Sequence, residues 1–529
     1  MTSTEEVQQF LQLPADVLLA VIEHLDLTDV LALRLTCRKC LSLCQERSVW
    51  VKIVQEQQQV LPMPPELQRD DNHAFEHVET QDLIKLSLQS ERVDRRWPTL
   101  RPKLDRWPTE EYKSTGTAPT ILLGMEMVLD RWLLLVYGEG VVQLHDLQAA
   151  ESGRQVAQMQ CNRAHGSQWS SFAAAIDPTH KILTVATSRC VPPYHLSIFT
   201  IDLTEPEIEI SMNRQIPLES PKTLHAMDPA LDLLALSASS KVQLMNISDR
   251  KGDVVVPAYP ETHDDLWNGI NAARFMGPYV LVARTRTIEL HHVFSALRPH
   301  GPRTPSLMHS FPMTTFKDVS FSDCKAGPNS LEMTMLVYDV IQGLYQYRIE
   351  VHNPAEDEVH PRLSVTQTGL YPLGLPLQAS INLAPRSESD SSSSPTSPPE
   401  TPTPTFSHTH FLQNIGHLAH GTSAVQSRGF LSAFAMGPQG HRAMWVERRR
   451  GGVAREIQVW SRRREGAAPP SAAWVYHFGA DCEEMEKKVV YTINSFDLRE
   501  DIICCAFSES RGIIVLGNRL GNISVLPID

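Results

Sequence analysis

The chain has 529 residues, of which 42% are hydrophobic, 21% charged and 7% aromatic. This composition excludes a wholly disordered or collagen-like chain, and no window reaches the roughly 18 unbroken apolar residues of a membrane helix. The formal net charge is −13, yet residues 442–464 carry eight arginines and two glutamates. An acidic body with a local basic segment argues against broad nucleic-acid binding, so we expect neither a nucleic-acid nor a membrane partner.

The N-terminus and the cysteines indicate the cellular compartment. Glu5 and Glu6 stand where a secretory signal would have a basic start. Nine cysteines, an odd number, are spread along the chain, which favours reduced thiols over a disulfide framework. We therefore expect the protein in the cytoplasm, the nucleus or both.

Residues 10–55 are predicted to form compact helices. After Leu13 and Pro14, apolar residues recur at three- and four-residue spacing, which places them on one helical face. Thr28 is the predicted N-cap of a second helix, a third helical segment runs over residues 40–43, and Trp50 lies in a final short helix. So small a unit cannot bury this many leucines alone, so part of its apolar surface is predicted to be a docking face.

The order and spacing of these residues match the pattern of a known family. Leu13 and Pro14 are followed by the acidic Asp16, a Cys-Arg pair begins at Cys37, and Trp50 closes the segment. The segment thus resembles an F-box, which implies a three-helix module that binds the Skp adaptor, and through it the cullin, of Skp–cullin–F-box ubiquitin ligases. The alternative is an unrelated amphipathic three-helix bundle. The implied adaptor contacts are Leu13, Pro14, Val17, Leu18, Ile22, Leu25, Leu31, Cys37 and Trp50.

Four positions depart mildly from the F-box pattern. Asp16 stands for the usual Glu, Val30 for Leu and Thr36 for Val. Cys40 stands where a tryptophan often follows the Cys-Arg pair, which weakens the local packing more than it weakens the resemblance.

Residues 56–115 are predicted to be a helical, proline-containing linker. Pro62, Pro64 and Pro65 mark a break, and an amphipathic helix follows that ends near residues 95–98. The sequence Arg-Trp-Pro-Thr occurs at 96–99 and again at 106–109. We interpret the linker as a scaffold that fixes the angle between two modules; a basic, aromatic partner site is the alternative.

Residues 116–529 are predicted to form a propeller from repeated units of apolar strand, turn, apolar strand, turn and alternating strand. The predicted third strands that begin at residues 196, 242 and 288 follow one another at intervals of 46 residues. This interval is the length of one four-stranded blade. Seven units predict seven blades, although the spacing also allows six or eight, and a pair of sandwiches is the alternative. The predicted third strands cover residues 142–145, 196–199, 242–245, 288–291, 344–347, 457–460 and 523–526.

These units resemble divergent WD-repeats. The usual Gly-His is absent, and the closest match to Trp-Asp is Trp460 followed by Ser461. The last unit ends on its third strand, so its outer strand must come from elsewhere if the ring is to close; we predict that residues 112–119 supply it. In plan the chain is similar to F-box proteins that carry a propeller as substrate receptor.

Residues 385–407 form a Ser/Thr/Pro-rich segment that should be a disordered insertion between strands. Four of its hydroxyl residues precede proline, so the segment is a candidate cluster of proline-directed phosphorylation sites. A tolerated surface insertion is the alternative. The candidate sites are Ser394, Ser397, Thr401 and Thr403.

The arginines near residue 450 are a candidate target-binding patch, because guanidinium groups suit phosphate and carboxylate. One cluster precedes the third strand of its unit and the other follows it, so the two are predicted to lie at opposite ends of one strand. A solvated face is the alternative. The patch comprises Arg448, Arg449, Arg450, Arg462, Arg463 and Arg464.

We predict no metal, no cofactor and no intrinsic enzyme. Cys37, Cys40 and Cys44 lack a clear fourth zinc ligand, and the sequence has no nucleophile elbow, Walker loop or His-Glu-x-x-His. The predicted function is the substrate-recognition subunit of a Skp–cullin–F-box ubiquitin ligase that recruits a protein target through the propeller. A cullin-independent F-box scaffold and an enzyme in the propeller channel are the alternatives. A second candidate zinc group, which lacks a cysteine or carboxylate at ligand spacing, is His408, His410, His417 and His420.

Overall fold

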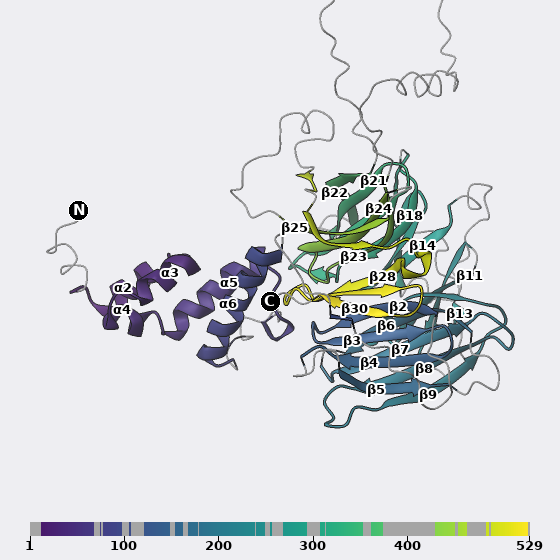
Figure 1. The fold of residues 1–529 in the computed structure, drawn as a ribbon, viewed down its shortest axis with the longest axis horizontal. Helices are drawn as coiled ribbons and strands as arrows, with labels where there is room; N and C mark the ends of the chain where they lie inside the picture. Colours follow the sequence, from purple (N-terminus) through teal and green to yellow (C-terminus); the bar gives the residue numbers. More distant parts are fainter. Residues whose placement is uncertain are drawn as a thin grey trace, which may run out of the picture.

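The computed structural model consists of an N-terminal helical arm and a C-terminal ring of β-sheets (Figure 1). The structure describes residues 12–67, 75, 78–97, 105–106, 121–148, 154–161, 168–177, 179–238, 240–248, 254–255, 268–293, 307–312, 314–352, 361–373, 429–449, 453–462, 483–485 and 488–526. No helix among them is long and apolar enough to cross a membrane. The Ser/Thr/Pro segment and its candidate phosphorylation sites lie outside the described residues.

The helical arm begins with four helices of the predicted N-terminal module. The Asp26 carboxylate accepts the Asp29 N–H at 2.8 Å and caps the second helix, so Thr28 lies inside that helix and is not its N-cap. The helix that contains Trp50 has 14 residues and is longer than predicted. The helices are α2 (Ala15–Ile22), α3 (Leu27–Arg34), α4 (Arg38–Leu43), α5 (Arg47–Val60), the 3-10 turn η1 (Pro65–Leu67) and α6 (Thr80–Arg96).

One hydrophobic core joins the N-terminal helices to α6. Leu18 and Trp50 from the first helices pack in the same cluster as Leu83 of α6. Inside it, the Trp50 indole N–H donates to the Cys44 carbonyl at 2.8 Å. The Ser87 hydroxyl donates to the Gln57 side chain at 2.7 Å. The arm therefore forms one packed body, with α5 and α6 between α2–α4 and the β-ring (Figure 1).

The described strands form seven sheets, each built on a row of four antiparallel strands. The first four blades are β2 (Leu122–Val128), β3 (Trp132–Tyr137), β4 (Val141–Asp146) and β5 (Arg154–Gln160); β6 (Trp169–Asp177), β7 (Ile182–Arg189), β8 (His195–Asp202) and β9 (Ile210–Pro217); β10 (Thr223–Asp228), β11 (Leu233–Ala238), β12 (Lys241–Asn246) and β13 (Val254–Val255); and β14 (Ile270–Met276), β15 (Tyr279–Arg284), β16 (Thr287–His292) and β17 (Leu307–Ser310).

The remaining three blades include two additional short strands and the closure of the ring. Blade 5 holds β18 (Phe316–Phe321), β19 (Lys325–Ala326), β20 (Ser330–Asp339), β21 (Gly343–His352), β22 (Arg362–Pro372) and β26 (Glu483–Glu484), with β26 parallel to β22. Blade 6 holds β23 (Gly429–Met436), β24 (Arg442–Arg449), β25 (Ala454–Ser461) and β27 (Lys488–Asn494). Blade 7 holds β28 (Ile502–Phe507), β29 (Ile514–Asn518), β30 (Ile523–Leu526) and β1 (Asp105–Arg106), and the 3-10 turn η6 (Leu498–Glu500) precedes it.

This pairing confirms the predicted propeller with seven blades. All seven predicted third strands are third in their sheets, in β4, β8, β12, β16, β21, β25 and β30. Each first strand also shifts register by one residue against its second strand, which is a β-bulge repeated in every blade.

The ring closes with a strand nearer the N-terminus than predicted. Asp105 pairs with Val525 and Arg106 with Ser524, so β1 is the outer strand of blade 7. The predicted residues 112–119 lie outside the described part of the chain. The chain leaves the arm at Trp97, which is buried against residues of blades 6 and 7, and β1 begins only eight residues later.

The ring has two faces that the backbone distinguishes. We call the face with the turns between first and second strands the linker face, because the arm contacts it through Met63 and Asp94. The distal face holds the turns between second and third strands and the connections between blades. The Trp169 N–H, which follows such a connection, donates to Gly138 in a turn of the neighbouring blade at 2.9 Å.

Candidate functional site

The first candidate site is an apolar face on α2–α4 that nothing in the described chain covers. Val17 and Val21 lie four residues apart and therefore share one side of α2. Leu13 precedes this helix, Leu35 caps α3 and Leu41 lies in α4. All five side chains are exposed, Leu35 to 89%. We call these five residues the N-terminal apolar face.

The residues predicted to contact the adaptor divide into three groups in the structure. Leu18, Ile22 and Trp50 are buried in the core of the arm and shape the face without lining it. Sequence spacing missed Val21, Leu35 and Leu41, because periodicity shows that a helix has an apolar side but not which apolar residues remain uncovered. The exposed predicted residues are Leu13, Pro14 and Val17, and the half-buried ones are Leu25, Leu31 and Cys37.

The three cysteines of the arm are structural. The Cys37 sulfur accepts the Cys40 N–H at 3.5 Å and caps α4, which lowers the pKa of the Cys37 thiol. Burial raises the pKa of the Cys40 and Cys44 thiols. No group of three or more potential metal ligands occurs among the described residues. The candidate histidines 408, 410, 417 and 420 lie outside them.

The side chain of Gln439 anchors the arm to the linker face by pairing with both backbone groups of Met63, as a neighbouring strand would. The Met63 N–H donates to Gln439 Oε1 at 2.8 Å, and Gln439 Nε2 donates to the Met63 carbonyl at 2.7 Å. Gln439 lies in the turn between β23 and β24, and its own N–H donates to the Glu509 carboxylate at 2.6 Å. This turn therefore contacts both the arm and blade 7.

A second anchor lies at the end of α6. The Arg442 side chain is 1% exposed and lies with its guanidinium carbon 5.2 Å from the centre of the Trp97 ring. It pairs with Asp94 at 3.2 Å and donates to the Glu509 carbonyl. The Trp97 indole N–H donates to the Trp460 carbonyl at 3.1 Å. These contacts fix the direction of α6 on the propeller.

The anchor continues across the junction between blades 7 and 1. Glu509 Oε1 accepts the N–H groups of His441 and Arg442 at 2.7 and 2.8 Å. The Asp130 carboxylate accepts the N–H groups of Glu509 and Ser510, both at 3.2 Å. Burial raises the pKa of Asp130 and that of Glu509, the latter to about 7. The linker face of blades 6, 7 and 1 is thus one hydrogen-bonded unit.

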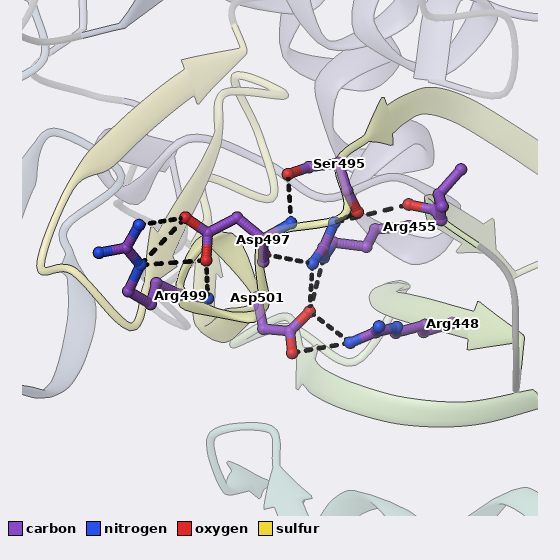
Figure 2. A network of polar contacts seen from close by, with 7 residues as sticks. Arg448, Arg455, Ser495, Asp497, Arg499 and Asp501 are labelled. Atoms are coloured by element: carbon purple, nitrogen blue, oxygen red, sulfur yellow. Dashed lines mark hydrogen bonds and ion pairs between the residues drawn. The ribbon is translucent and has the colours of Figure 1, made fainter.

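The predicted arginine patch does not form one continuous surface. Arg448 pairs with both oxygens of Asp501 at 2.8 Å (Figure 2). It also lies over the Phe430 ring. Its Cα opposes that of Arg455, whereas Arg462 follows Ser461 at the other end of β25. Arg448 therefore lies at the distal face and Arg462 at the linker face, which confirms opposite ends of one strand. Nothing is described of the side chain of Arg449, and Arg450, Arg463 and Arg464 lie outside the described residues.

A channel of about 720 Å³ runs between the first strands of all seven blades, and Pro65 of the arm lies at its lining. Four carboxylates line it, those of Glu126, Asp130, Asp228 and Asp323. Asp323 pairs with Arg274 at 2.9 Å. Burial raises the pKa of Glu126 to about 7, against the nearby positive charge of Arg274. The contact of Asp323 with Arg274 is an ion pair that links blades 4 and 5.

The comparisons with known proteins concern each module separately. Residues 10–52 match the model of the F-box domain. The chain is similar in structure to the WD40 domain of SCAP from fission yeast, with 8% identity, a TM-score of 0.37 and coverage of 78% of this chain and 85% of that one. It is also similar to Hsv2 of Kluyvelomyces marxianus, with 8% identity, a TM-score of 0.39 and coverage of 76% and 89%. No curated protein matches the sequence. The number of blades rests on the strand pairing alone.

Proposed function

We propose that this chain, which joins an F-box domain to a seven-bladed β-propeller, is the substrate-recognition subunit of a Skp–cullin–F-box ubiquitin ligase. The architecture fits a substrate-recognition role in such a ligase and is typical of non-catalytic receptor subunits. F-box domains typically bind the Skp adaptor and, through it, the cullin. In this proposal the propeller holds a protein target, and the ligase delivers the ubiquitin-conjugating enzyme to it.

The observation that carries the proposal is the N-terminal apolar face. Five large apolar side chains lie exposed on or next to three neighbouring short helices. These helices lie at the end of the arm away from the propeller (Figure 1). Exposed apolar side chains gathered on one part of a protein are characteristic of an interface. Its position leaves an adaptor free to bind without contacting the ring, while the linker face is occupied by the arm. The distal face is therefore the propeller surface that we assign to the target.

The anchors between arm and ring support a role based on proximity. Arg442, Gln439 and Trp97 hold α6 at a fixed angle, so the adaptor and the target would be held at a fixed separation. A rigid connection raises the effective concentration of the target near the charged enzyme. The chain contributes position, and no nucleophile of its own enters this account.

The test is capture of purified Skp adaptor and cullin by the full chain. Val17→Asp with Val21→Asp should lower adaptor capture more than tenfold, because both carboxylates would lie in an apolar interface. Met308→Asp, at an exposed apolar position in the propeller, is the matched control and should bind like wild type. Unchanged capture by the double variant would reject the assigned face. Capture of the adaptor without cullin would favour the cullin-independent scaffold.

A further inference from the structure

The connection between β27 and β28, residues 495–501, exposes two large apolar side chains on the distal face. Phe496 is 88% exposed and Leu498 58%. Phe496 is the most exposed large apolar residue among those described in the propeller. Single exposed apolar residues are normal on protein surfaces, so exposure alone does not indicate a site. What distinguishes this loop is how it is held.

One buried guanidinium contacts the loop at three points (Figure 2). Arg455 of β25 is 1% exposed on its side chain. It donates to the carbonyls of Ser495 and Asp497, both at 2.8 Å, and contacts Asp501 Oδ1 at 2.6 Å. Both ends and the centre of the loop are thus bound to the same side chain. A guanidinium presents its donors in a fixed plane, so these three contacts restrict the loop strongly.

A further strand and a turn also hold Asp501. Arg448 of β24 donates to both of its carboxylate oxygens at 2.8 Å. The Arg519 N–H, in the turn between β29 and β30, donates to the Asp501 carbonyl at 3.1 Å. Within the loop, Asp497 accepts the Arg499 N–H at 2.9 Å and caps η6. The backbone that carries Phe496 is therefore preorganised by blades 6 and 7.

A rigid loop with an exposed phenyl ring is an efficient binding anchor. Covering an aromatic side chain removes roughly 150–250 Å² from water. Binding does not have to order the loop first, because its contacts are already made within the ring. Anchors of this kind, an aromatic residue on a fixed backbone, dominate the energetics of many protein interfaces.

The charge around the loop indicates what the partner carries. The chain as a whole has a formal charge of −13. Around the loop, in contrast, Arg448, Arg455, Arg499 and Arg519 stand against Asp497, Glu500 and Asp501, a local net charge of +1. Arg448 and Arg499 are paired with Asp501 and Asp497, so the exposed Arg519 is the cation that an acidic group on a partner would meet beside the loop.

We propose that Phe496 and Leu498 are the apolar anchor of the target-binding surface, and that the partner is a protein segment with a large apolar residue flanked by Asp or Glu. This inference rests on the proposed function, because it places the target on the distal face. The arginines that the sequence suggested as ligands have a different role here. Arg448 and Arg455 position the loop, and the exposed aromatic residue makes the main contact.

The test uses the full chain in complex with purified Skp adaptor and a library of random 12-residue peptides displayed on phage. Wild type should enrich peptides that combine an aromatic or aliphatic residue with Asp or Glu. A synthetic peptide from that set should bind Phe496→Ala at least tenfold more weakly and Met308→Ala with unchanged affinity. Asp501→Asn, which weakens the brace without removing the anchor, should weaken binding by about threefold to tenfold.

Three outcomes would overturn the proposal. These are equal binding of the enriched peptide to wild type and Phe496→Ala, enrichment of basic peptides, and a self-associated wild type that Phe496→Ala converts to a monomer in sedimentation. The proposed function fails separately. If Val17→Asp with Val21→Asp still binds the adaptor while Phe496→Ala loses the peptide, the adaptor assignment is wrong and the anchor stands. If the double variant loses the adaptor while Phe496→Ala still binds the peptide, the adaptor assignment stands and the anchor is wrong.

Discussion

Asp94 of α6 and Arg442 of β24 form an ion pair at 3.2 Å across 348 residues of sequence. The Arg442 side chain is almost fully buried, whereas that of Asp94 is 21% exposed. Removal of one partner of a buried pair leaves an uncompensated charge, which costs more than the pair contributes. The pair is therefore a sensitive point in the connection between the two modules.

Asp94→Ala should destabilise the protein by about 2 kcal/mol, within the range for loss of a hydrogen bond to a charged group, because Arg442 keeps its contact with Glu509 but loses its carboxylate partner. Thermal unfolding of the full chain measures the effect. Glu91→Ala is the control: Glu91 pairs with the exposed Arg95 on the same helix, and such pairs are worth about 0.3–0.5 kcal/mol. Equal effects of the two variants would show that the Asp94–Arg442 pair does not anchor the arm.

Gln439→Leu should release the segment around Met63 from the ring. The variant removes one donor and one acceptor, each worth about 1 kcal/mol, including the Gln439 Oε1 atom that accepts the Met63 N–H. Hydrogen exchange at the Met63 amide should accelerate at least tenfold. The Leu61 amide, which donates to Gln57 at 2.7 Å within α5, is the internal control and should keep its rate. Unchanged exchange at Met63 would contradict this anchor.

Trp97→Ala should cost about 3–5 kcal/mol, the usual range for deletion of a fully buried large aromatic side chain. Trp97 packs with Phe507 at a ring separation of 5.4 Å, and the Trp460 carbonyl would lose its donor. Trp97→Phe keeps part of the volume and should cost less. Thermal unfolding of both variants checks the order, and a smaller loss in the alanine variant would be inconsistent with the packing.

Stability should fall as the pH rises from about 4.5 to about 7, in part through Glu126. Burial raises its folded pKa to about 7 from 4.5, so in this window the folded state holds a proton that the unfolded state has released. The slope of unfolding free energy against pH is then negative, worth up to about 3 kcal/mol across the window. Glu126→Gln should flatten the profile by that amount. Glu205→Gln, on an exposed loop, should leave its shape unchanged.

Much of the fold was predictable because its repeat is local. Alternation of apolar and polar residues located the third strand of every blade, and helical spacing located α2 and α6. The β-bulge in every first strand was not predicted, since one extra residue in a strand leaves no distinct trace in so divergent a repeat. The closing strand was misplaced because β1 has only two residues, too few for any periodic pattern.

The candidate sites, like the fold, could be predicted only in part from the sequence. Leu18, Ile22 and Trp50 carry the F-box pattern, yet the structure buries them and exposes Val21, Leu35 and Leu41 instead. We interpreted the arginine cluster as a binding patch because a run of like charges can be recognised from the sequence. Phe496, in contrast, is one of 16 phenylalanines, and nothing in its local sequence separates an exposed ring from a buried one.

The sequence by itself determined the F-box, the seven strand repeats and the opposite ends of the arginine patch, since each depends on spacing within a few tens of residues. Only the tertiary structure decided that Arg442 and Gln439 bind the arm and that Arg448 and Arg455 brace the loop of Phe496. Those contacts join the arm to the ring, or one blade to the next, because the partners of a buried charge are set by packing and not by neighbours in the chain.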